Sequence, residues 1–217
     1  MAKATDPFVR ARQFVEKIRR DRSGVTAIEF AFATPLFLTL TLGGIELANL
    51  ALAHMRVSQM AMTVADNAGR VTAGIDEANI REVFEGAKVI SKGIEFEDHG
   101  RMVLSSLEEN GRAGQRQGQV IRWQRCWGNN RRINPAYGRE GDGKNDSSLR
   151  AGLGSRAKIT AAPDTAVMFV EAQYDYQPLI WTAFLSSRVI RYESAFNVRG
   201  RQVNTIANGG GIPPSRC

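Results

Sequence analysis

The feature that most constrains this chain is a long apolar run. Residues 30–45 read FAFATPLFLTLTLGGI without a charge, and the wider segment 25–53 contains two charged residues, Glu29 and Glu46. About 20 apolar residues span the hydrocarbon core of a bilayer as a helix. The segment therefore predicts a transmembrane helix over residues 25–53.

The charges on the two sides of this segment predict its orientation. Residues 1–24 carry seven basic and three acidic side chains, a net charge of +4. Residues 54–217 carry 22 basic and 17 acidic side chains, a net charge of +5 over a much longer stretch. Short basic flanks stay on the cytoplasmic side of a membrane. We therefore expect a basic cytoplasmic leader and an extracytoplasmic part of about 150 residues, enough for one soluble domain.

The junction between leader and apolar run, residues 19–29, reads RRDRSGVTAIE. A carboxylate inside a membrane helix is costly, so Glu29 predicts a functional role. The pattern is similar to the type IV pilin signal, in which a prepilin peptidase cuts after a glycine and the fifth mature residue is Glu. This resemblance implies cleavage between Gly24 and Val25. The new Val25 amine and the Glu29 carboxylate of a neighbouring subunit could then pair and fix the axial register.

Two other interpretations of this segment remain open. Ala51-Leu52-Ala53 fits the A-x-A pattern of a secretory signal, and cleavage there would start the mature chain at His54. The charged leader and the apolar run are longer than is usual for such signals. The third interpretation is an uncleaved anchor. Segment length and the intramembrane charge favour the pilin-type signal.

Residues 20–50 also resemble the TadE-like pseudopilins of the tight-adherence (Tad/Flp) pilus system. The resemblance rests on Glu29-Phe30-Ala31, then Pro35, a Leu-rich run and the ending Gly44-Ile45-Glu46. A weaker echo is the segment YDYQPL at residues 174–179. The related TadG-like proteins carry an added domain with an Asp-x-Ser-x-Ser motif, which is absent from this sequence.

The resemblance implies a minor pilin-like protein of the bacterial inner membrane that helps to build the pilus. Its implied partners are a prepilin peptidase, other pilins or pseudopilins bound through the N-terminal helix, the inner-membrane assembly platform and the lipid bilayer. It assigns Gly24 and Val25 to processing, and Glu29 with Phe30 to recognition and register.

Helical periodicity continues beyond the membrane segment. Apolar residues at four- and three-residue spacing predict one helix up to Arg70, with a stripe of Val57, Ala61, Val64, Ala68 and Val71. Thr72-Ala-Gly74 ends this helix, and Asp76 is the predicted N-cap of a second one. Its apolar face contains Ile80, Val83, Phe84, Ala87 and Ile90. We therefore expect residues 54–91 to be helical.

Four runs of strand-like composition follow, at residues 101–107, 119–126, 165–174 and 188–198. Residues 108–111, EENG, suit a hairpin turn between the first two. Residues 128–158 are rich in Gly, Asn, Arg, Asp and Ser and predict a long surface loop. The expected fold is α+β, with a long pilin-like helix, a short helix and a small antiparallel sheet over residues 92–207, followed by a tail over 208–217.

The chain has two cysteines, Cys126 and Cys217. An extracytoplasmic location is oxidising, so they are predicted to form a disulfide. The bridge would close a loop of about 90 residues and stabilise the domain by about 4–5 kcal/mol.

No catalytic constellation is recognisable in the sequence. The two histidines, His54 and His99, lack the spacing of a metal-ligand set or a catalytic triad. Residues 140–146, EGDGKND, are acidic, but Lys144 disrupts the register of a calcium loop. We therefore expect no enzyme activity, no metal and no cofactor.

Segment 112–150 is basic, with nine basic and three acidic residues around Trp123, Trp127 and Tyr137. Such a pattern could bind nucleic acid or an anionic polymer. A solvated loop, with the tryptophans in the core or stacked on arginines, is favoured because no nucleic-acid-binding fold is recognisable. The alternative function is therefore a membrane-anchored periplasmic module that binds a surface polymer or DNA through this loop.

Overall fold

The computed structural model describes residues 7–180, 188–201, 203–207 and 211–217. The first six residues of the expected leader and residues 208–210 of the expected tail lie outside the described residues. The chain forms two compact units, Met1–Leu47 and Ala48–Cys217. The fold is α+β, as the sequence predicts.

The first unit contains helix α1, Pro7–Arg20, and the start of helix α2, Ser23–Arg70. The charge of the leader predicts its topology, and helix α1 is an addition to that prediction. Phe8, Ala11, Val15 and Ile18 recur at helical spacing and give α1 one apolar face. The two helices are separated at Asp21 and Arg22, where the Asp21 carboxylate accepts a hydrogen bond of 2.9 Å from the Ser23 backbone N–H.

The second unit begins within α2, whose last turns carry the predicted apolar stripe. Val57, Ala61, Val64 and Ala68 are all buried there. Helix α3, Glu77–Ile90, begins at the predicted cap. The Asp76 carboxylate accepts from the Asn79 N–H at 2.8 Å, and the Asn79 side chain accepts from the Asp76 N–H at 3.1 Å. This capping box satisfies two backbone donors at the helix start.

The main sheet contains β2 (Gly100–Glu109), β3 (Gln119–Trp127), β4 (Ala166–Asp175) and β5 (Val189–Asn197), each overlapping a predicted run. The strands are antiparallel neighbours in the order β3-β2-β4-β5. A second, parallel pair joins β1 (Ile75–Asp76) to β6 (Ile206–Ala207). Short helices α4 (Phe96–His99) and η1 (Gly114–Arg116) complete the described elements.

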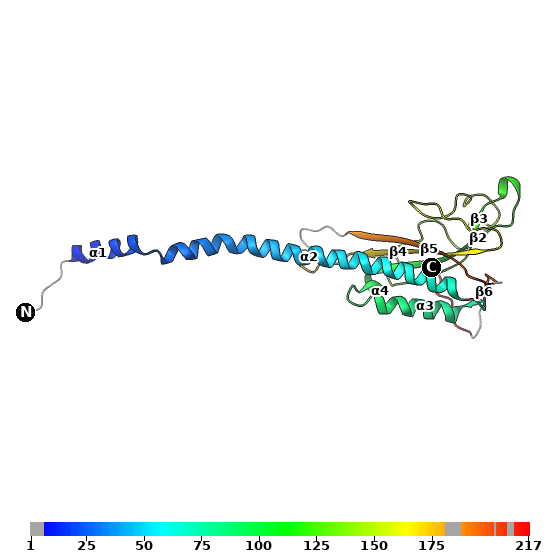
Figure 1. The fold of residues 1–217 in the computed structure, drawn as a ribbon, viewed down its shortest axis with the longest axis horizontal. Coiled ribbons are helices and arrows are strands. Elements are labelled where there is room, and N and C mark those ends of the chain that lie inside the picture. The colour runs from blue at the N-terminus through cyan, green and yellow to red at the C-terminus, as the bar shows by residue number, and fades with distance from the viewer. Residues whose placement is uncertain (1–6, 181–187, 202, 208–210) are drawn as a thin grey trace, which may run out of the picture. The chain divides into compact units, whose positions relative to one another are not determined.

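Both faces of the sheet are covered. Residues of α2 and α3 pack on one face, in a cluster that includes Val64, Phe84 and Trp123. A smaller cluster on the other face contains Leu107, Ile121, Leu153, Ala161, Val167 and Phe169. Figure 1 shows the helices and the loop of residues 128–158 on opposite sides of the strands. The β-rich part is therefore three layers deep.

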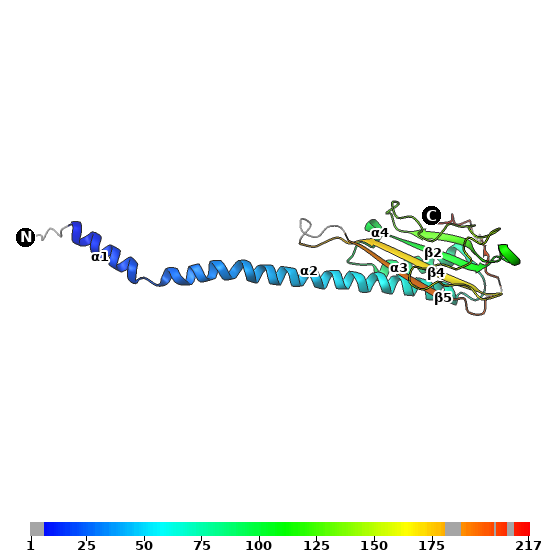
Figure 2. The same cartoon turned by 90° about the horizontal axis from the view of Figure 1, so that it is seen from above.

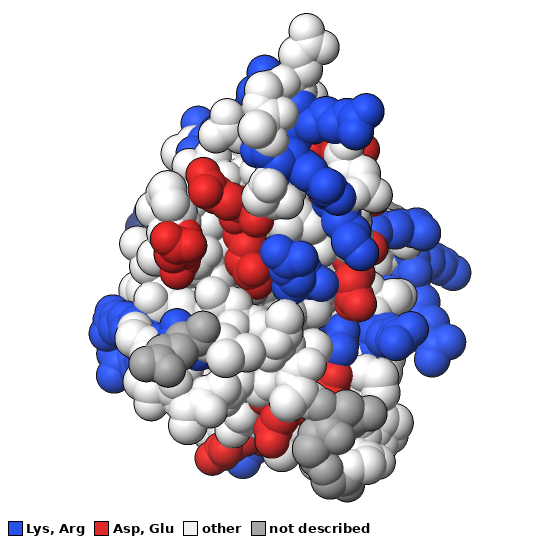
Figure 3. Space-filling view, turned by 90° about the vertical axis from the view of Figure 1, so that its right-hand side faces the viewer, with Lys and Arg blue, Asp and Glu red and all other residues white. Residues whose placement is uncertain are grey.

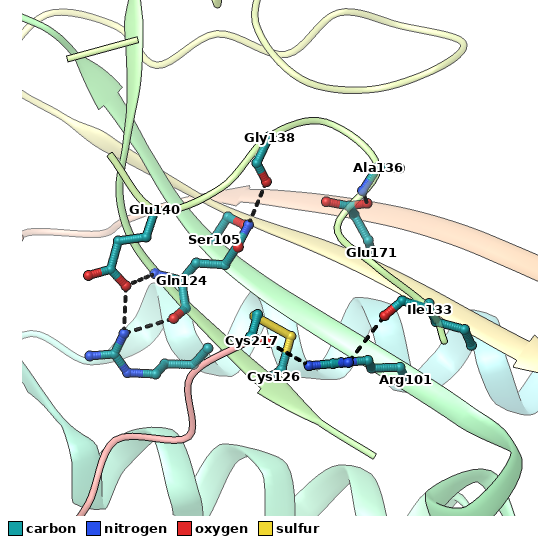
Figure 4. Close-up of a disulfide and its surroundings, with 11 residues drawn as sticks. Arg101, Ser105, Gln124, Cys126, Ile133, Ala136, Gly138, Glu140, Glu171 and Cys217 are labelled. Atoms are coloured by element: carbon teal, nitrogen blue, oxygen red, sulfur yellow. Dashed lines mark hydrogen bonds and ion pairs between the residues drawn. A yellow bond between two sulfur atoms is a disulfide. The ribbon is translucent and has the colours of Figure 1, made fainter. Parts of the chain in front are cut away.

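Residues 128–158 form a loop without helix or strand, and parts of this loop pack into the domain. Leu153 is 1 % exposed and forms a β-bridge with Ile159. Buried polar side chains of the sheet hold the loop backbone, as Figure 4 shows. The Gln124 amide donates to the Gly138 carbonyl at 3.1 Å, and the Glu171 carboxylate accepts from the Ala136 N–H at 2.8 Å. Composition could not indicate this, because the partners are backbone groups.

The predicted disulfide is present between Cys126 on β3 and Cys217, with 5.0 Å between the Cα atoms. The Cys126 N–H donates to the Ser215 carbonyl at 2.7 Å. The buried Arg101 guanidinium donates to the carbonyls of Cys217 and Ile133 at 3.0 and 3.2 Å (Figure 4). The last residues of the chain are thus fixed beside β3.

Candidate assembly segment

The predicted processing site lies in the first turn of α2. A Cβ atom placed on Gly24 would meet no heavy atom within 4 Å, and Val25 is 52 % exposed. The Val25 N–H donates to the Arg22 carbonyl at 3.1 Å, immediately after the break between α1 and α2. Nothing in the described part of the first unit covers the Gly24–Val25 bond.

Glu29 and Phe30 follow on the same helix, and both are exposed. Glu29 is four residues beyond Val25, so the two lie on one helix face about 6 Å apart along the axis. Within residues 7–47, no ion pair involves Glu29. Its charge is therefore available to a group outside this chain or to a newly formed terminus.

The surroundings of Glu29 are apolar on every side of the helix. Large exposed side chains include Ile28, Phe30, Phe32, Leu36, Phe37, Leu38 and Leu40. An 18-residue window of α2 has a mean hydropathy of 1.7, and 11 % of it is buried. A helix that is apolar all round and uncovered suits a lipid environment or other helices.

Pro35 lies inside α2 and cannot donate to the carbonyl one turn earlier. Two threonines beside it use their hydroxyls on the helix backbone. Thr34 Oγ1 donates to the Phe30 carbonyl and Thr39 Oγ1 to the Pro35 carbonyl, each at 2.7 Å. These bonds satisfy the two hydroxyl groups, which lipid could not, but neither of them reaches the Ala31 carbonyl, which loses its helix donor at Pro35.

The Gly44-Ile45-Glu46 ending falls near the boundary between the two units. A Cβ on Gly43 or Gly44 would meet no heavy atom of the described residues within 4 Å, so no contact among them requires a glycine there. Glu46 is 4 % exposed. Small residues on a helix surface allow a neighbouring helix to approach closely.

A family model described as TadE-like protein matches residues 24–66. Residues 24–66 are TadE-like. The match begins at Gly24 and includes Glu29, Pro35 and Glu46, which confirms the resemblance drawn from the sequence. Neither the curated proteins nor the solved structures gave a match.

The matched segment is similar to TadE-like proteins over part of the chain. Among the described residues, α2 is the one helix that is long and apolar enough to cross a membrane. The match ends at residue 66, within α2, so the family says nothing of the sheet. Any role of the sheet has to be argued from its own geometry.

Outside the TadE-like segment, the basic loop was the other candidate site. Figure 3 shows Lys and Arg side chains gathered over one part of the face that it draws. Within the basic segment 112–150, several arginines have structural partners. Arg150 donates to three carbonyls, those of Gly114, Gln115 and Gln117, and Arg112 donates to Lys144 and Asn145. These hydrogen bonds join neighbouring loop segments, so fewer guanidinium N–H groups remain to bind a polymer.

The remaining candidates also have structural roles. Trp123 is 1 % exposed and its Nε1–H donates to the Asn204 carbonyl at 3.0 Å. Trp127 stacks on Phe84 and Phe96. His54 lies 3.3 Å from the Tyr192 hydroxyl, and His99 lies near Glu95. Among the described residues, no three His, Cys, Asp or Glu side chains gather to hold a metal ion.

Proposed function

We propose that this chain is a minor pilin-like component of the Tad/Flp pilus machinery, which assembles through α2 after a prepilin peptidase cuts between Gly24 and Val25. One observation carries the proposal. The TadE-like segment starts at that junction and places an exposed carboxylate, Glu29, on an otherwise apolar and uncovered helix.

Cleavage would give the segment two complementary charges. The freed Val25 amine and the Glu29 carboxylate are one helical turn apart in a single chain. In a bundle of such helices, the amine of one subunit pairs with the carboxylate of its neighbour. An unpaired carboxylate in this low-dielectric setting is costly, so the pair selects one axial register. Phe30, 71 % exposed beside it, offers apolar contact to the peptidase or to the neighbouring helix.

The first unit supports an orientation with the N-terminus in the cytoplasm and the β-rich domain in the periplasm. Helix α1 combines exposed Phe8, Phe14 and Ile18 with three basic residues in its last turn. A basic amphipathic helix lies in the interface of an anionic leaflet. In this position α1 holds the leader at the inner face of the inner membrane, next to the Gly24–Val25 bond.

The alternatives receive less support. Cleavage after Ala53 would divide α2 within its continuous helical span and remove a residue that is 1 % exposed in the core. A plain anchor gives no role to Glu29. The binding module requires free charge on the basic loop, where Arg112 and Arg150 are already hydrogen-bonded.

The test is the N-terminal residue of the mature protein in native membranes, measured by peptide mass spectrometry. We expect Val25. Gly24→Leu should leave the leader attached, and Glu29→Leu should abolish assembly while the chain still enters the membrane. Phe32→Leu, an exposed apolar exchange on the same helix, is the control and should assemble normally. A mature chain that starts at His54, or an intact leader in assembled pili, would refute the proposal.

A further inference from the structure

The outer edge of β5 has no hydrogen-bonding partner among the described residues. The Tyr176 N–H donates to the Arg188 carbonyl and the Val198 N–H to the Ala166 carbonyl. These two bonds fix which residues of β5 are hydrogen-bonded to β4. The backbone N–H and C=O groups of every second residue from Arg188 to Val198 point toward β4. The N–H and C=O groups of the residues between them point outward, namely Val189, Arg191, Glu193, Ala195 and Asn197.

The opposite edge of the sheet differs, because the chain covers it. On β3 the N–H groups of Ile121, Gln124 and Cys126 donate to Asp142, Glu140 and Ser215. Figure 2 shows β5 beside α2 at one edge and the C-terminus beside the strands at the other. Exposed edges invite another strand, and proteins normally cover or blunt them. The loop and the tail cover the β3 edge, whereas among the described residues the outward groups of β5 have no ladder partner, and Gly69 of α2 lies beside Asn197 at the end of the strand.

Three cavities line the open edge and share residues. The largest, about 720 Å³, is bounded by His54 and Tyr192 on the α2 side and by Tyr137 and Ile159 on the loop side. A cavity of about 410 Å³ continues past Ala195, and one of about 280 Å³ continues past His54. Together they form a groove along β5 in which an extended chain has room for alternate side chains on both faces.

The charge of this groove indicates what it would accept. Arg156 and Arg191 line the large cavity, and neither belongs to an ion pair in the described part of the chain. The Glu193 carboxylate is already used, since it accepts from the Tyr137 hydroxyl and from the Ser155 N–H. Burial alone would raise the pKa of Glu193, but these hydrogen bonds outweigh it and lower the pKa. These donors are neutral, so Glu193 keeps its negative charge, and the lining of the large cavity carries two arginines against one carboxylate, a net positive charge.

We propose that β5 accepts an extended segment of a different protein as a fifth strand of the sheet, and that this segment places a carboxylate between Arg156 and Arg191. The outward backbone N–H and C=O groups of Arg191, Glu193 and Ala195 form the ladder hydrogen bonds with the added strand. The two guanidinium groups supply selectivity, because a strand with the wrong charge leaves them unpaired.

The direction of β5 argues against a closed pair of identical chains. His54 contacts Tyr192 and Gly69 lies beside Asn197, so α2 and β5 run in the same direction. Two copies joined β5 to β5 by a two-fold axis across the strands would point their α2 segments in opposite directions. Chains anchored in one membrane cannot do this. This step rests on the proposed function; the open edge and the groove do not.

The experiment uses the full-length chain in native membranes. A photo-crosslinking residue, p-benzoylphenylalanine, replaces Val189, which is 48 % exposed at the start of β5, or Val89, which is 64 % exposed on α3 and serves as the matched control. After irradiation, the joined peptides are sequenced by mass spectrometry. We expect Val189 to join a segment of a different protein with Asp or Glu within a few residues, and Val89 to give no such product.

Two further changes in the Val189-labelled chain test the geometry. Ala195→Pro removes one outward N–H without removing a bond to β4, and Arg191→Glu reverses one charge; each should lower the yield about tenfold. Arg191→Lys should keep most of it. The intact Cys126–Cys217 bridge in each variant reports folding. A product with this chain's own peptide, no product from a folded chain, or a yield indifferent to both changes would overturn the proposal. A mature terminus at Val25 in the same sample shows that the pilin-like function stands even then.

Discussion

The guanidinium of Arg125 on β3 donates hydrogen bonds to both carboxylate oxygens of Glu77, the first residue of α3. Arg125 Nε lies 2.9 and 3.1 Å from Glu77 Oε1 and Oε2, and the side chains are 5 % and 4 % exposed. Glu140 from the loop accepts from the same guanidinium at 2.9 Å. Burial alone would lower the pKa of Arg125, but the two carboxylates raise it. One arginine therefore joins helix, sheet and loop.

Removing one partner of this buried pair should be costly. We expect Glu77→Ala to reduce the free energy of unfolding by about 3–5 kcal/mol, because the buried Arg125 guanidinium then keeps only one carboxylate partner, the exposed Glu140. The double variant Glu77→Leu with Arg125→Met should recover most of the loss. Denaturant unfolding of the full chain in detergent measures both. Equal losses in the single and double variants would show that packing, and not the ion pair, sets the effect.

Glu171 should make the stability of the domain depend on pH. Burial raises its pKa from 4.5 to about 7, and the hydrogen bond from Ala136 offsets only part of this. The folded state then holds the proton more tightly than the unfolded state. The stabilisation is complete below about pH 4.5 and is lost as the pH rises through about 7.

Replacing Glu171 by Gln should therefore flatten the profile. Gln keeps an acceptor for the Ala136 N–H and cannot ionise, so Glu171→Gln should stabilise the domain at pH 8 by up to about 3 kcal/mol. Thermal unfolding between pH 4 and 8 tests this. Glu85→Gln, at an exposed position on α3, is the control and should leave the profile unchanged. An unchanged profile for Glu171→Gln would mean that the loop opens to hydrate the carboxylate.

The disulfide should stabilise the domain mainly by restricting the unfolded chain. Cys126 and Cys217 are 91 residues apart, which corresponds to about 4–5 kcal/mol in the chain-entropy model. Cys126→Ser with Cys217→Ser should lose a large part of this and free the final residues for proteolysis. Limited proteolysis and denaturant unfolding check the two effects. If the double variant keeps the full free energy of unfolding, the hydrogen bonds of Arg101 and Ser215, and not the disulfide, account for the stabilising effect of the tail.

Arg201 closes the C-terminal end of α2. Its Nε donates to the Val71 carbonyl at 2.8 Å, Nη2 donates to the Ala68 carbonyl, and the residue is 7 % exposed. A cation at a helix C-terminus satisfies free carbonyls and opposes the helix dipole. We expect Arg201→Ala to cost about 1–3 kcal/mol in unfolding free energy. Lysine has one ammonium group for the two carbonyls. The free energy of unfolding of Arg201→Lys should therefore lie between those of Arg201→Ala and the original chain.

Much of the fold could be predicted because burial imposes regular spacing. The stripe from Val57 to Ala68 must face the sheet, so its spacing specifies a helix. The β-branched and aromatic residues of β4 lie in the centre of the sheet, where both faces are covered, and this composition marked the strand. The helix cap at Asp76 could be predicted because its hydrogen-bonding partner, Asn79, is only three residues away in the sequence.

Long-range polar contacts could not be predicted in the same way. Gln124, Arg101 and Arg201 hold backbone carbonyls 14 to 133 residues away, and a carbonyl has no sequence signature. The strand order and the open edge of β5 depend on which chain segments cover β3. The apolar residues of α1 have helical spacing in the sequence, so this helix could have been predicted from the leader.

The sealed edge of β3 limits how many molecules this domain can recruit. Polymerisation by strand addition requires a subunit with two open edges, one to give and one to receive. Here Asp142 and Glu140 of the loop and Ser215 of the tail bind the outward N–H groups of β3, and the Cys126–Cys217 disulfide holds the tail in place. A sheet that gains one strand at β5 is complete, so the domain can bind a single partner but cannot propagate a chain of sheets.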